Sequence, residues 1–184
     1  MSQPCKVLIL YFHPSQKKSR VGTALSQAVC GVANVTFRDM YGECPDFFID
    51  VKKEQLLLEQ HDLIVFQHPV YWYSCPPLLK LWLDEVLEYG WAYGSHGTKL
   101  SGKTLLSAVT AGGSAEAYSP TGSNRYDIKT LFSPFDQTAH WCGMHYAEPF
   151  VVHGARGLSD EQLAAACRDY VMKIKRCIAH RVES

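Results

Sequence analysis

Three short stretches of the sequence carry residue types that could bind a charged, flat ligand. The first is a polar loop whose members are His13, Ser15, Lys17, Lys18, Ser19 and Arg20. The second sets Tyr71, Trp72 and Tyr73 side by side, and the third is the glycine pair Gly112-Gly113. Basic side chains at a helix start suit a phosphate, aromatic rings suit a flat ring, and glycines let the backbone approach a ligand closely.

Each stretch also has a simpler explanation. The basic loop could be a solvated surface loop, and the three aromatic residues could belong to the core or to an interface between proteins. A pair of glycines often marks only a turn. The place of the three stretches in the fold decides between these alternatives, because they can bind one ligand only if they lie close together in space.

The elements that position these stretches can be predicted from apolar spacing. Apolar runs predict strands at residues 6–12, 35–40, 63–66, 103–111 and 144–153. Helical spacing predicts helices at residues 21–29, 52–60, 78–87, 128–142 and 159–180, with a kink at Pro134. We expect Asp50 to cap the second helix and the pattern Ser159-Asp160-Glu161-Gln162 to cap the last. Strands that alternate with helices predict one α/β domain over residues 1–184, a five-stranded parallel sheet with helices on both faces.

The three stretches follow the first, third and fourth predicted strands. In a doubly wound sheet, ligands bind outside the carboxyl ends of the strands. We therefore expect a phosphate seat, an aromatic wall and a glycine floor at one edge, an arrangement that fits flavin mononucleotide (FMN). A dinucleotide-binding Rossmann domain, the alternative fold, would place Gly-x-Gly-x-x-Gly after the first strand, and this loop has no glycine before Gly22. A tightly held NAD is therefore disfavoured.

The composition narrows the class of protein. Lys plus Arg and Asp plus Glu number 18 each, which predicts no basic surface for nucleic acid. No apolar run reaches the ~20 residues that a membrane span needs, and the start at Met1 has no secretory signal. Seven cysteines without a Cys-x-x-Cys pair predict free thiols in a reducing cytoplasm, and no metal site is expected from the spacing of histidines and cysteines.

Five motifs in the chain resemble the NAD(P)H:quinone oxidoreductase family, which has the flavodoxin-like fold. They are Tyr11-Phe12-His13-Pro14, residues 45–50 (PDFFID), Gln67-His68-Pro69, residues 73–80 (YSCPPLLK) and residues 90–94 (GWAYG). Within that family the sequence is similar to the small ancillary flavoproteins of bacterial glutathione-gated potassium efflux systems, the KefF and KefG type. The similarity extends from residue 6 to about residue 170.

The resemblance implies an enzyme that holds FMN without a covalent bond, takes hydride from NADH or NADPH and passes two electrons to a quinone. It also implies a homodimer, with Trp91 and Tyr93 at the subunit interface, bound peripherally to a Kef-type potassium efflux antiporter on the cytoplasmic side of the inner membrane. The implied phosphate and ribityl contacts are His13, Ser19, Arg20, Val21 and Gly22. The implied ring contacts are Val70, Tyr71, Trp72, Tyr73, Thr110, Ala111, Gly112 and Gly113.

The resemblance also assigns the catalytic residues. Tyr118 takes the place of a tyrosine with which relatives stabilise the reduced flavin, and the N–H groups of Gly112 and Gly113 are expected to act with it. This sequence has Asn124 where those relatives carry a histidine, and Gly22 where many carry an asparagine. Because an asparagine takes no proton at neutral pH, a second hypothesis stays open: a non-catalytic regulatory subunit of the antiporter, with flavin as a structural or sensing ligand. A flavodoxin-type electron carrier is disfavoured, since such carriers present an acidic face and this chain is neutral.

Other residues with possible chemistry have structural explanations that we favour. Cys75 could be a redox thiol beside the ring, but a small buried cysteine is the better expectation. His68 ends a strand and is expected to be a structural hydrogen-bonding residue. We expect Trp82 and Trp141 to lie in the core.

Overall fold

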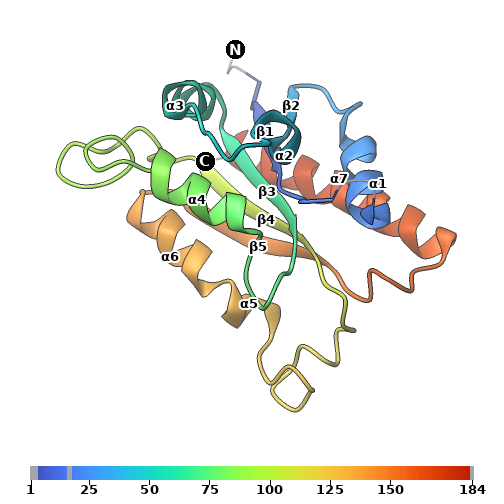
Figure 1. Cartoon of the computed structure of the whole chain (residues 1–184). Coiled ribbons are helices and arrows are strands. Elements are labelled where there is room, and N and C mark those ends of the chain that lie inside the picture. The colour runs from blue at the N-terminus through green and yellow to red at the C-terminus, as the bar shows by residue number, and fades with distance from the viewer. Residues whose placement is uncertain (1–3, 16–17, 183–184) are drawn as a thin grey trace.

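Five parallel strands form the central sheet in the computed structural model, which describes residues 4–15 and 18–182 (Figure 1). The strands are β1 (Val7–Tyr11), β2 (Val35–Asp39), β3 (Leu63–Pro69), β4 (Thr104–Thr110) and β5 (His145–Val152). They lie in the order β2-β1-β3-β4-β5, and every neighbouring pair is parallel. This is the flavodoxin-like order, so the expected fold class is confirmed.

Helices cover both faces of the sheet. One face carries α1 (Arg20–Val29) and α7 (Asp160–Val182). The other carries α2 (Met40–Glu43), α3 (Val51–Gln60), α4 (Pro77–Val86), α5 (Ile128–Leu131) and α6 (Ser133–Trp141). Figure 1 shows α1 and α7 together on one side, with α3, α4 and α6 on the other. Two apolar cores therefore form, one on each side of the sheet.

The composition of the inner strands explains their position. All residues of β1 and β3 are buried, as expected for near-continuous apolar runs that are covered on both faces. Alternate side chains of β1 serve the two cores, with Leu8 and Leu10 on the α3 and α4 side and Val7 and Ile9 on the α1 and α7 side. Packing on both faces fixes these strands, and with them the start of each loop that leaves their carboxyl ends.

Two helix starts form as the capping patterns predict. Asp50 accepts a hydrogen bond from the Lys53 N–H at 3.1 Å, which caps α3. At the start of α7, the Ser159 hydroxyl accepts from the Gln162 N–H at 3.2 Å, and the Gln162 side chain accepts from the Ser159 N–H at 2.8 Å. This reciprocal pair is a capping box, and it fixes the end of the loop between β5 and α7.

Two expectations about helices are wrong. Residues 128–142 form two helices instead of one kinked helix, because Phe132 separates α5 from α6. Pro134 lies in the first turn of α6, where its missing N–H needs no partner. The short helix α2 adds to the predicted elements, and it starts directly after β2 because Asp39 accepts a hydrogen bond from the Gly42 N–H.

The two tryptophans expected in the core differ. Trp82 is 1% exposed, as expected, but Trp141 is 65% exposed. The buried residues of α6 and its C-cap are Phe135, Ala139 and Cys142, which follow helical spacing. Trp141 does not share that stripe, so its ring projects from the surface.

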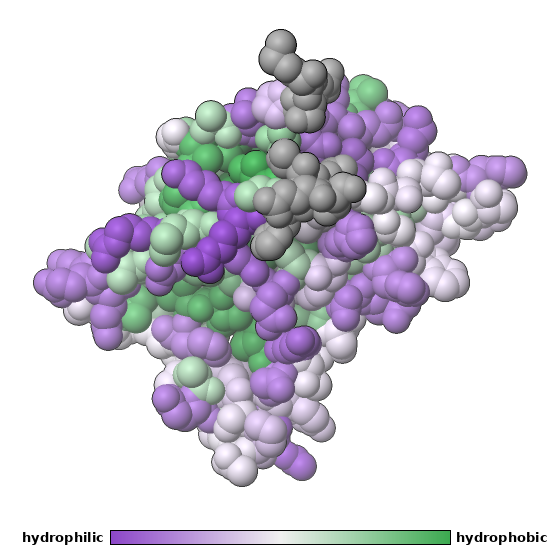
Figure 2. Space-filling view, turned by 180° about the vertical axis from the view of Figure 1, so that it is seen from behind, coloured by the Kyte–Doolittle hydropathy of each residue, from purple (hydrophilic) through white to green (hydrophobic). Residues whose placement is uncertain are grey.

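Seen from behind, the surface is mostly hydrophilic, with apolar residues gathered in a recessed band near the centre (Figure 2). Within the described ranges, no helix is both long and apolar enough to cross a membrane. All seven cysteines are free thiols. Among the described residues, no three His, Cys, Asp or Glu side chains lie together in a way that could hold a metal ion.

Candidate functional site

Two adjoining chambers open at the carboxyl edge of the sheet. The strand order reverses between β1 and β3, and ligands of doubly wound sheets bind beyond such a point. The first chamber, of about 420 Å³, lies among the loop after β1, the end of β3 and the turn after β5. The second, of about 530 Å³, lies between the turn after β3 and the loop of residues 113–124. Val70, Gly112 and Arg156 line both chambers, so we treat the two as one cleft.

Nearly all the residues that the sequence assigned to the cofactor site line this cleft. His13, Ser19, Arg20, Val21, Gly22, Tyr71 and Thr110 line the first chamber, Trp72, Tyr73, Gly113 and Tyr118 line the second, and Val70 and Gly112 line both. Ala111 lies beneath the wall, because its side chain is fully buried and its N–H is donated to the Val152 carbonyl at 2.9 Å. Three loops that are distant in the sequence thus meet at one edge.

The first chamber contains the start of α1. The first N–H groups of a helix have no acceptor within the helix, and they carry the positive end of its dipole. Ser19 holds the N-cap position without a side-chain hydrogen bond to these groups, and its hydroxyl accepts from the Tyr11 hydroxyl at 3.0 Å. A Cβ on Gly22 would collide with both hydroxyl oxygens. This Tyr11–Ser19 pair therefore explains the glycine at this position.

The side chains of the first chamber differ in how free they are to meet a ligand. The Arg20 guanidinium donates to the Leu158 carbonyl at 2.7 Å and to the Asp160 carboxylate at 2.5 Å. His13 Nδ1 accepts from the Ser15 N–H at 3.0 Å, and burial lowers the pKa of this imidazole, so His13 is neutral at pH 7. The positive end of α1 therefore contributes more to the field in this chamber than His13 does.

The aromatic stretch after β3 is a tight two-residue hairpin. Tyr71 and Ser74 exchange N–H to carbonyl hydrogen bonds of 3.1 and 3.0 Å. Trp72 and Tyr73, at the centre of the turn, have φ values of 46° and 63°, which is a type I′ turn that usually contains asparagine and glycine. The left-handed conformation costs roughly 1–2 kcal/mol for each such residue. The turn leaves Trp72 92% exposed, so this ring is not part of the core. Backbone strain of this kind collects at ligand sites.

The glycine turn after β4 leaves room above its backbone. A Cβ on Gly112 would meet only one atom within 4 Å, Arg156 Nε at 3.8 Å, so the protein itself does not require a glycine there. A Cβ on Gly113 would lie 3.1 Å from the Tyr118 ring. Neither Gly112 nor Gly113 donates its N–H to another described residue. The turn therefore presents free donors next to space that a side chain would fill.

Tyr118 and Asn124 line the second chamber beside this turn. Burial raises the pKa of the Tyr118 hydroxyl, with a further contribution from Tyr73, so this hydroxyl keeps its proton at neutral pH and can donate a hydrogen bond. The Asn124 side-chain oxygen accepts from the Tyr73 hydroxyl at 3.4 Å. Asn124 thus lines the same chamber as Tyr118, and it brings an uncharged amide there.

Arg156 is the main residue of the cleft that the sequence did not point to. It follows β5 in the segment Gly154-Ala155-Arg156-Gly157 and lines both chambers. The rule that identified the other loops, that ligands bind beyond the carboxyl ends of parallel strands, also applies to the loop after β5. A cationic residue between two glycines at that position is the signal that could have identified it.

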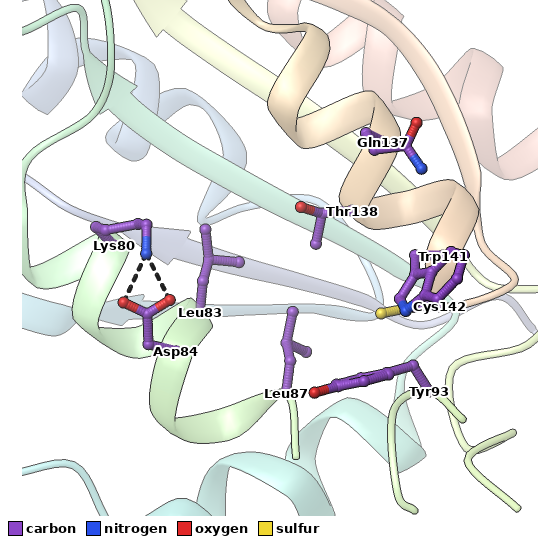
Figure 3. A pocket seen from close by; sticks show the side chains of 9 residues that line it. All are labelled: Lys80, Leu83, Asp84, Leu87, Tyr93, Gln137, Thr138, Trp141 and Cys142. Atoms are coloured by element: carbon purple, nitrogen blue, oxygen red, sulfur yellow. Dashed lines mark hydrogen bonds and ion pairs between the residues drawn. The ribbon is translucent and has the colours of Figure 1, made fainter. Parts of the chain in front are cut away.

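A further cavity, of about 450 Å³, lies between α4 and α6 (Figure 3). Its walls are Lys80, Leu83, Asp84 and Leu87 of α4, Gln137, Thr138, Trp141 and Cys142 at α6, and Tyr93. Lys80 and Asp84 pair with each other at 2.5 Å. Burial raises the pKa of the Cys142 thiol, so it stays protonated and unreactive. This α4–α6 groove offers a ligand no unpaired charge, which makes the cleft the candidate site.

Three other residues behave as structural groups. Burial raises the pKa of the Cys75 thiol, which disfavours the redox explanation. His68 is fully buried, donates from Nδ1 to the Pro69 carbonyl at 2.9 Å, and has its pKa lowered by burial to about 4. Trp91 donates to the Glu59 carboxylate at 3.0 Å. The subunit interface expected at Trp91 and Tyr93 stays a prediction.

The cleft fits the FMN that the resemblance implies. The start of α1 in the first chamber suits a phosphate group. The open space above Gly112, with the free N–H groups of the turn, suits the polar edge of a flat ring. The exposed Trp72 ring could form one wall of such a site. These features belong to one continuous cleft, with the phosphate seat at one end and the ring seat at the other.

Comparison with known proteins agrees with this geometry. Residues 5–174 match a family described by its flavodoxin-like fold. A curated relative, the glutathione-regulated potassium-efflux system ancillary protein KefG of Pectobacterium carotovorum, is 48% identical over 170 residues, which are 92% of this chain and 93% of the relative. The match therefore covers nearly the whole of both proteins.

Solved structures extend the same picture. General stress protein 14 of Treponema denticola, crystallised in complex with FMN, is 39% identical with a TM-score of 0.88 and covers 94% of this chain and 99% of that one. An NADPH-quinone reductase of P. pentosaceus is 30% identical with a TM-score of 0.83, over 90% and 95% of the two chains. A structure described as the tryptophan halogenase Th-Hal of Streptomycin violaceusniger is 48% identical with a TM-score of 0.87, over 89% and 95%.

The resemblance noted in the sequence is thereby confirmed on independent grounds. The strand order, the position of the cleft and the extent of the sequence match agree with one another. The chain belongs to the family with the flavodoxin-like fold, in which KefG ancillary proteins and NAD(P)H quinone reductases are its relatives.

Proposed function

We propose that the protein is an FMN-dependent NAD(P)H:quinone oxidoreductase that also serves as an ancillary subunit of a glutathione-regulated potassium–proton antiporter. The observation that carries the enzymatic part is the continuous cleft between the start of α1 and the free N–H groups of Gly112 and Gly113. Relatives named as an FMN complex and as an NADPH-quinone reductase support the cofactor and the reaction class.

When bound, FMN would supply the redox chemistry, accepting hydride from NADH or NADPH and passing two electrons to a quinone. The quinone gains two electrons and two protons and leaves as the hydroquinone. One proton originates in the hydride and the other in solvent. The chain itself binds, orients and shields the reacting groups.

Each part of the cleft has a role in this proposal. The N–H groups at the start of α1 hold the phosphate, with Ser19 and Gly22 keeping the backbone close. The N–H groups of Gly112 and Gly113 face the polar edge of the ring and stabilise charge that develops there. The Tyr118 hydroxyl, which keeps its proton because burial raises its pKa, donates a further hydrogen bond. Trp72 covers the ring and limits access of water.

The ancillary part of the proposal concerns the partner. The KefG relative has a name that places it in a glutathione-regulated potassium efflux system, and its sequence matches over nearly the whole chain. We infer a homodimer that docks on a Kef-type antiporter at the cytoplasmic side of the inner membrane and raises potassium efflux when electrophiles appear.

The enzymatic part is tested by visible absorption spectroscopy. The purified protein is mixed with FMN, freed of excess cofactor, and treated with NADH without oxygen. We expect a retained flavin spectrum that bleaches with NADH and returns when a quinone such as menadione is added. A protein that retains no flavin after this procedure would contradict the proposal.

The second candidate is a regulatory subunit in which FMN is a structural or sensing ligand. The observation that favours it is Asn124, an uncharged amide in the second chamber at the position where the family resemblance implies a histidine. This candidate predicts that FMN is retained but that NADH does not bleach it. Retention without bleaching would select the regulator over the enzyme.

The partner is tested separately from the enzyme. The protein is passed over the immobilised cytoplasmic domain of a Kef antiporter in the presence of glutathione. Both candidates predict that the antiporter domain retains the protein. Failure to bind under these reducing conditions would contradict the ancillary role and leave the enzymatic part standing.

A further inference from the structure

Arg156 has a place in the cleft but no role in the proposed function. It lies in the turn after β5 and lines both the first and the second chamber. Its side chain is exposed. Within the described ranges, no carboxylate forms an ion pair with it. A guanidinium without a partner at the junction of two chambers is available to a ligand.

The backbone of this turn is tied to the glycine turn. The Gly154 N–H donates to the Gly113 carbonyl at 2.9 Å, and the Ala155 N–H donates to the Ala111 carbonyl at 3.0 Å. Gly154 itself has a φ of 61°, a left-handed conformation that suits glycine. These bonds continue the pairing of β4 and β5 past the ends of both strands. Arg156 therefore starts from a fixed point beside the site.

The side chain of Arg156 extends over the open space of the cleft. Its Nε lies 3.8 Å from the point at which a Cβ on Gly112 would stand, and no other atom of the described residues outside 111–113 lies within 4 Å of that point. Gly112 is the residue whose missing side chain opens the ring seat. The guanidinium is thus next to the part of the cleft that the flat ring would occupy.

The charges of the two chambers are unequal. The first chamber has Lys18 and Arg20 in its wall besides Arg156, together with the start of α1. The other polar residues that line the second chamber have uncharged side-chain types, namely Tyr73, Tyr118, Ser123 and Asn124. Among the described residues that line the second chamber, Arg156 is the one with a full charge. Replacing Arg156 by a neutral residue would leave the lining of the second chamber without a charged side chain.

We infer that Arg156 is a redox-tuning residue, whose guanidinium stabilises the reduced form of FMN at the ring end of the cleft. The inference rests on the proposed function, because it requires FMN to bind there. Reduction adds negative charge to the ring, and a cation next to the ring favours that charge. Charge placed near a cofactor is one of the means by which a protein sets its potential. Arg156 thus supplies a charge that the amide of Asn124 cannot.

The test compares the affinities for the two redox forms of FMN. Arg156→Gln removes the charge and Arg156→Lys keeps it. Arg168 is an exposed residue of α7 that lines neither chamber, so Arg168→Gln is the matched control for a change of net charge. Dissociation constants for oxidised and chemically reduced FMN are measured by titration, together with the midpoint potential of the bound cofactor. We expect Arg156→Gln to bind reduced FMN about tenfold more weakly and oxidised FMN within about threefold of the parent protein. A tenfold loss confined to the reduced form corresponds to about 30 mV for a two-electron couple.

The outcomes separate this inference from the proposed function. If the parent protein binds neither form of FMN, the proposed function fails and the inference fails with it. If the parent binds FMN and Arg156→Gln weakens both forms equally, Arg156 is a phosphate contact and the redox role is wrong. If the potential of Arg156→Gln equals that of Arg168→Gln, the inference alone is wrong. A lowered potential in Arg156→Gln that Arg156→Lys restores would support it.

Discussion

The cleft and the helix layer of α3, α4 and α6 both concentrate polar groups, but the helix layer pairs its buried charges with one another, whereas the cleft leaves several donors without a partner. There, the Glu54 carboxylate accepts from the Arg38 guanidinium at 2.5 Å and from the Trp82 indole at 2.9 Å. Lys80 and Asp84 form their own pair on α4. These bonds hold β2, α3 and α4 together, and the groups that form them are not free to bind a ligand.

In the cleft, some polar groups are bonded to one another, but several donors are unpaired. The N–H groups of Gly112 and Gly113 and the guanidinium of Arg156 have no partner among the described residues. Trp72 and Tyr73 also adopt left-handed backbone conformations that cost stability. The cavity in the helix layer, at about 450 Å³, is as large as the first chamber of the cleft, at about 420 Å³. What distinguishes a site from a gap here is the presence of unsatisfied donors and charge. Substitutions in the helix layer should therefore change stability, and those in the cleft should change binding.

The largest expected effect is in the helix layer, for Glu54→Ala. This change leaves the buried Trp82 indole without an acceptor and removes one of two carboxylates from Arg38, so we expect a loss of about 3–5 kcal/mol in the free energy of unfolding. Urea denaturation measures it. Glu85→Ala, at an exposed position of α4, is the control and should change stability by less than about 0.5 kcal/mol. Equal stabilities of the two variants would contradict this account of the helix layer.

A pH effect of similar size is expected from His68, which points from β3 against Phe132 and Phe135. Burial lowers its pKa from 6.5 to about 4. As the pH falls below 6.5, the unfolded chain takes up the proton first, so stability is lost between pH 6.5 and pH 4 and is retained above pH 6.5. The loss assigned to His68 is about 3 kcal/mol over that range.

His68→Phe isolates this contribution, because phenylalanine cannot take up a proton. Unfolding free energies of the parent and the variant are measured at pH 7 and at pH 4.5. The variant should lose less stability than the parent, and His13, whose pKa burial also lowers, contributes equally to both. Parallel pH profiles for the two proteins would show that His68 does not control this part of the pH dependence.

In the cleft, Gly112→Val is expected to have the largest effect. The added side chain would stand in the open space above the turn, with only Arg156 within 4 Å of its Cβ. We expect FMN to bind at least about 100-fold more weakly, because the ring can no longer approach the backbone. Stability should change by less than about 0.5 kcal/mol, since Gly112 does not have a positive φ. Fluorescence titration with FMN checks the first expectation, and urea denaturation checks the second.

The control for this experiment is Gly31→Val, where an added side chain also meets open space but follows the Cys30 cap of α1 and lines neither chamber. It should bind FMN as the parent does. Gly113→Val is a less clean test, because a Cβ there would press on the Tyr118 ring. Retained FMN affinity in Gly112→Val would mean that the ring seat lies elsewhere.

Much of this architecture could be predicted from local patterns. The inner strands are long apolar runs, and the side chains of Asp50 and Ser159 cap helices as their sequences indicate. Since all strands are parallel, the loops that follow them meet at one edge of the sheet. This rule predicted that His13 and Gly112 lie in one site, and both line the first chamber. These features depend on residues that are neighbours in the chain.

What could not be predicted depends on contacts between distant segments. The type I′ turn at Trp72 lacks the asparagine and glycine that usually mark it, so the residue types of the turn did not indicate that conformation. Arg156 reaches the cleft through backbone bonds between two turns. Gly22 is explained by the Tyr11 hydroxyl, which comes from a different element. Trp141 lies outside the buried stripe of Phe135, Ala139 and Cys142, and its exposure follows from that place on α6.

The smallest effects are expected from substitutions of the two exposed tryptophans. Trp72 lines the cleft and Trp141 lines the α4–α6 groove, so the two substitutions allow a direct comparison of these regions. Trp72 and Trp141 are 92% and 65% exposed, so neither ring contributes much to the core. Trp72→Ala should weaken FMN binding by about three- to tenfold, the worth of one aromatic contact, while Trp141→Ala should leave FMN affinity unchanged. Both variants should keep their unfolding free energies within about 1 kcal/mol of the parent. If Trp141→Ala weakened FMN binding as much as Trp72→Ala does, the α4–α6 groove would be part of a binding site. The presence of unpaired donors and charges would then not identify binding sites in this fold.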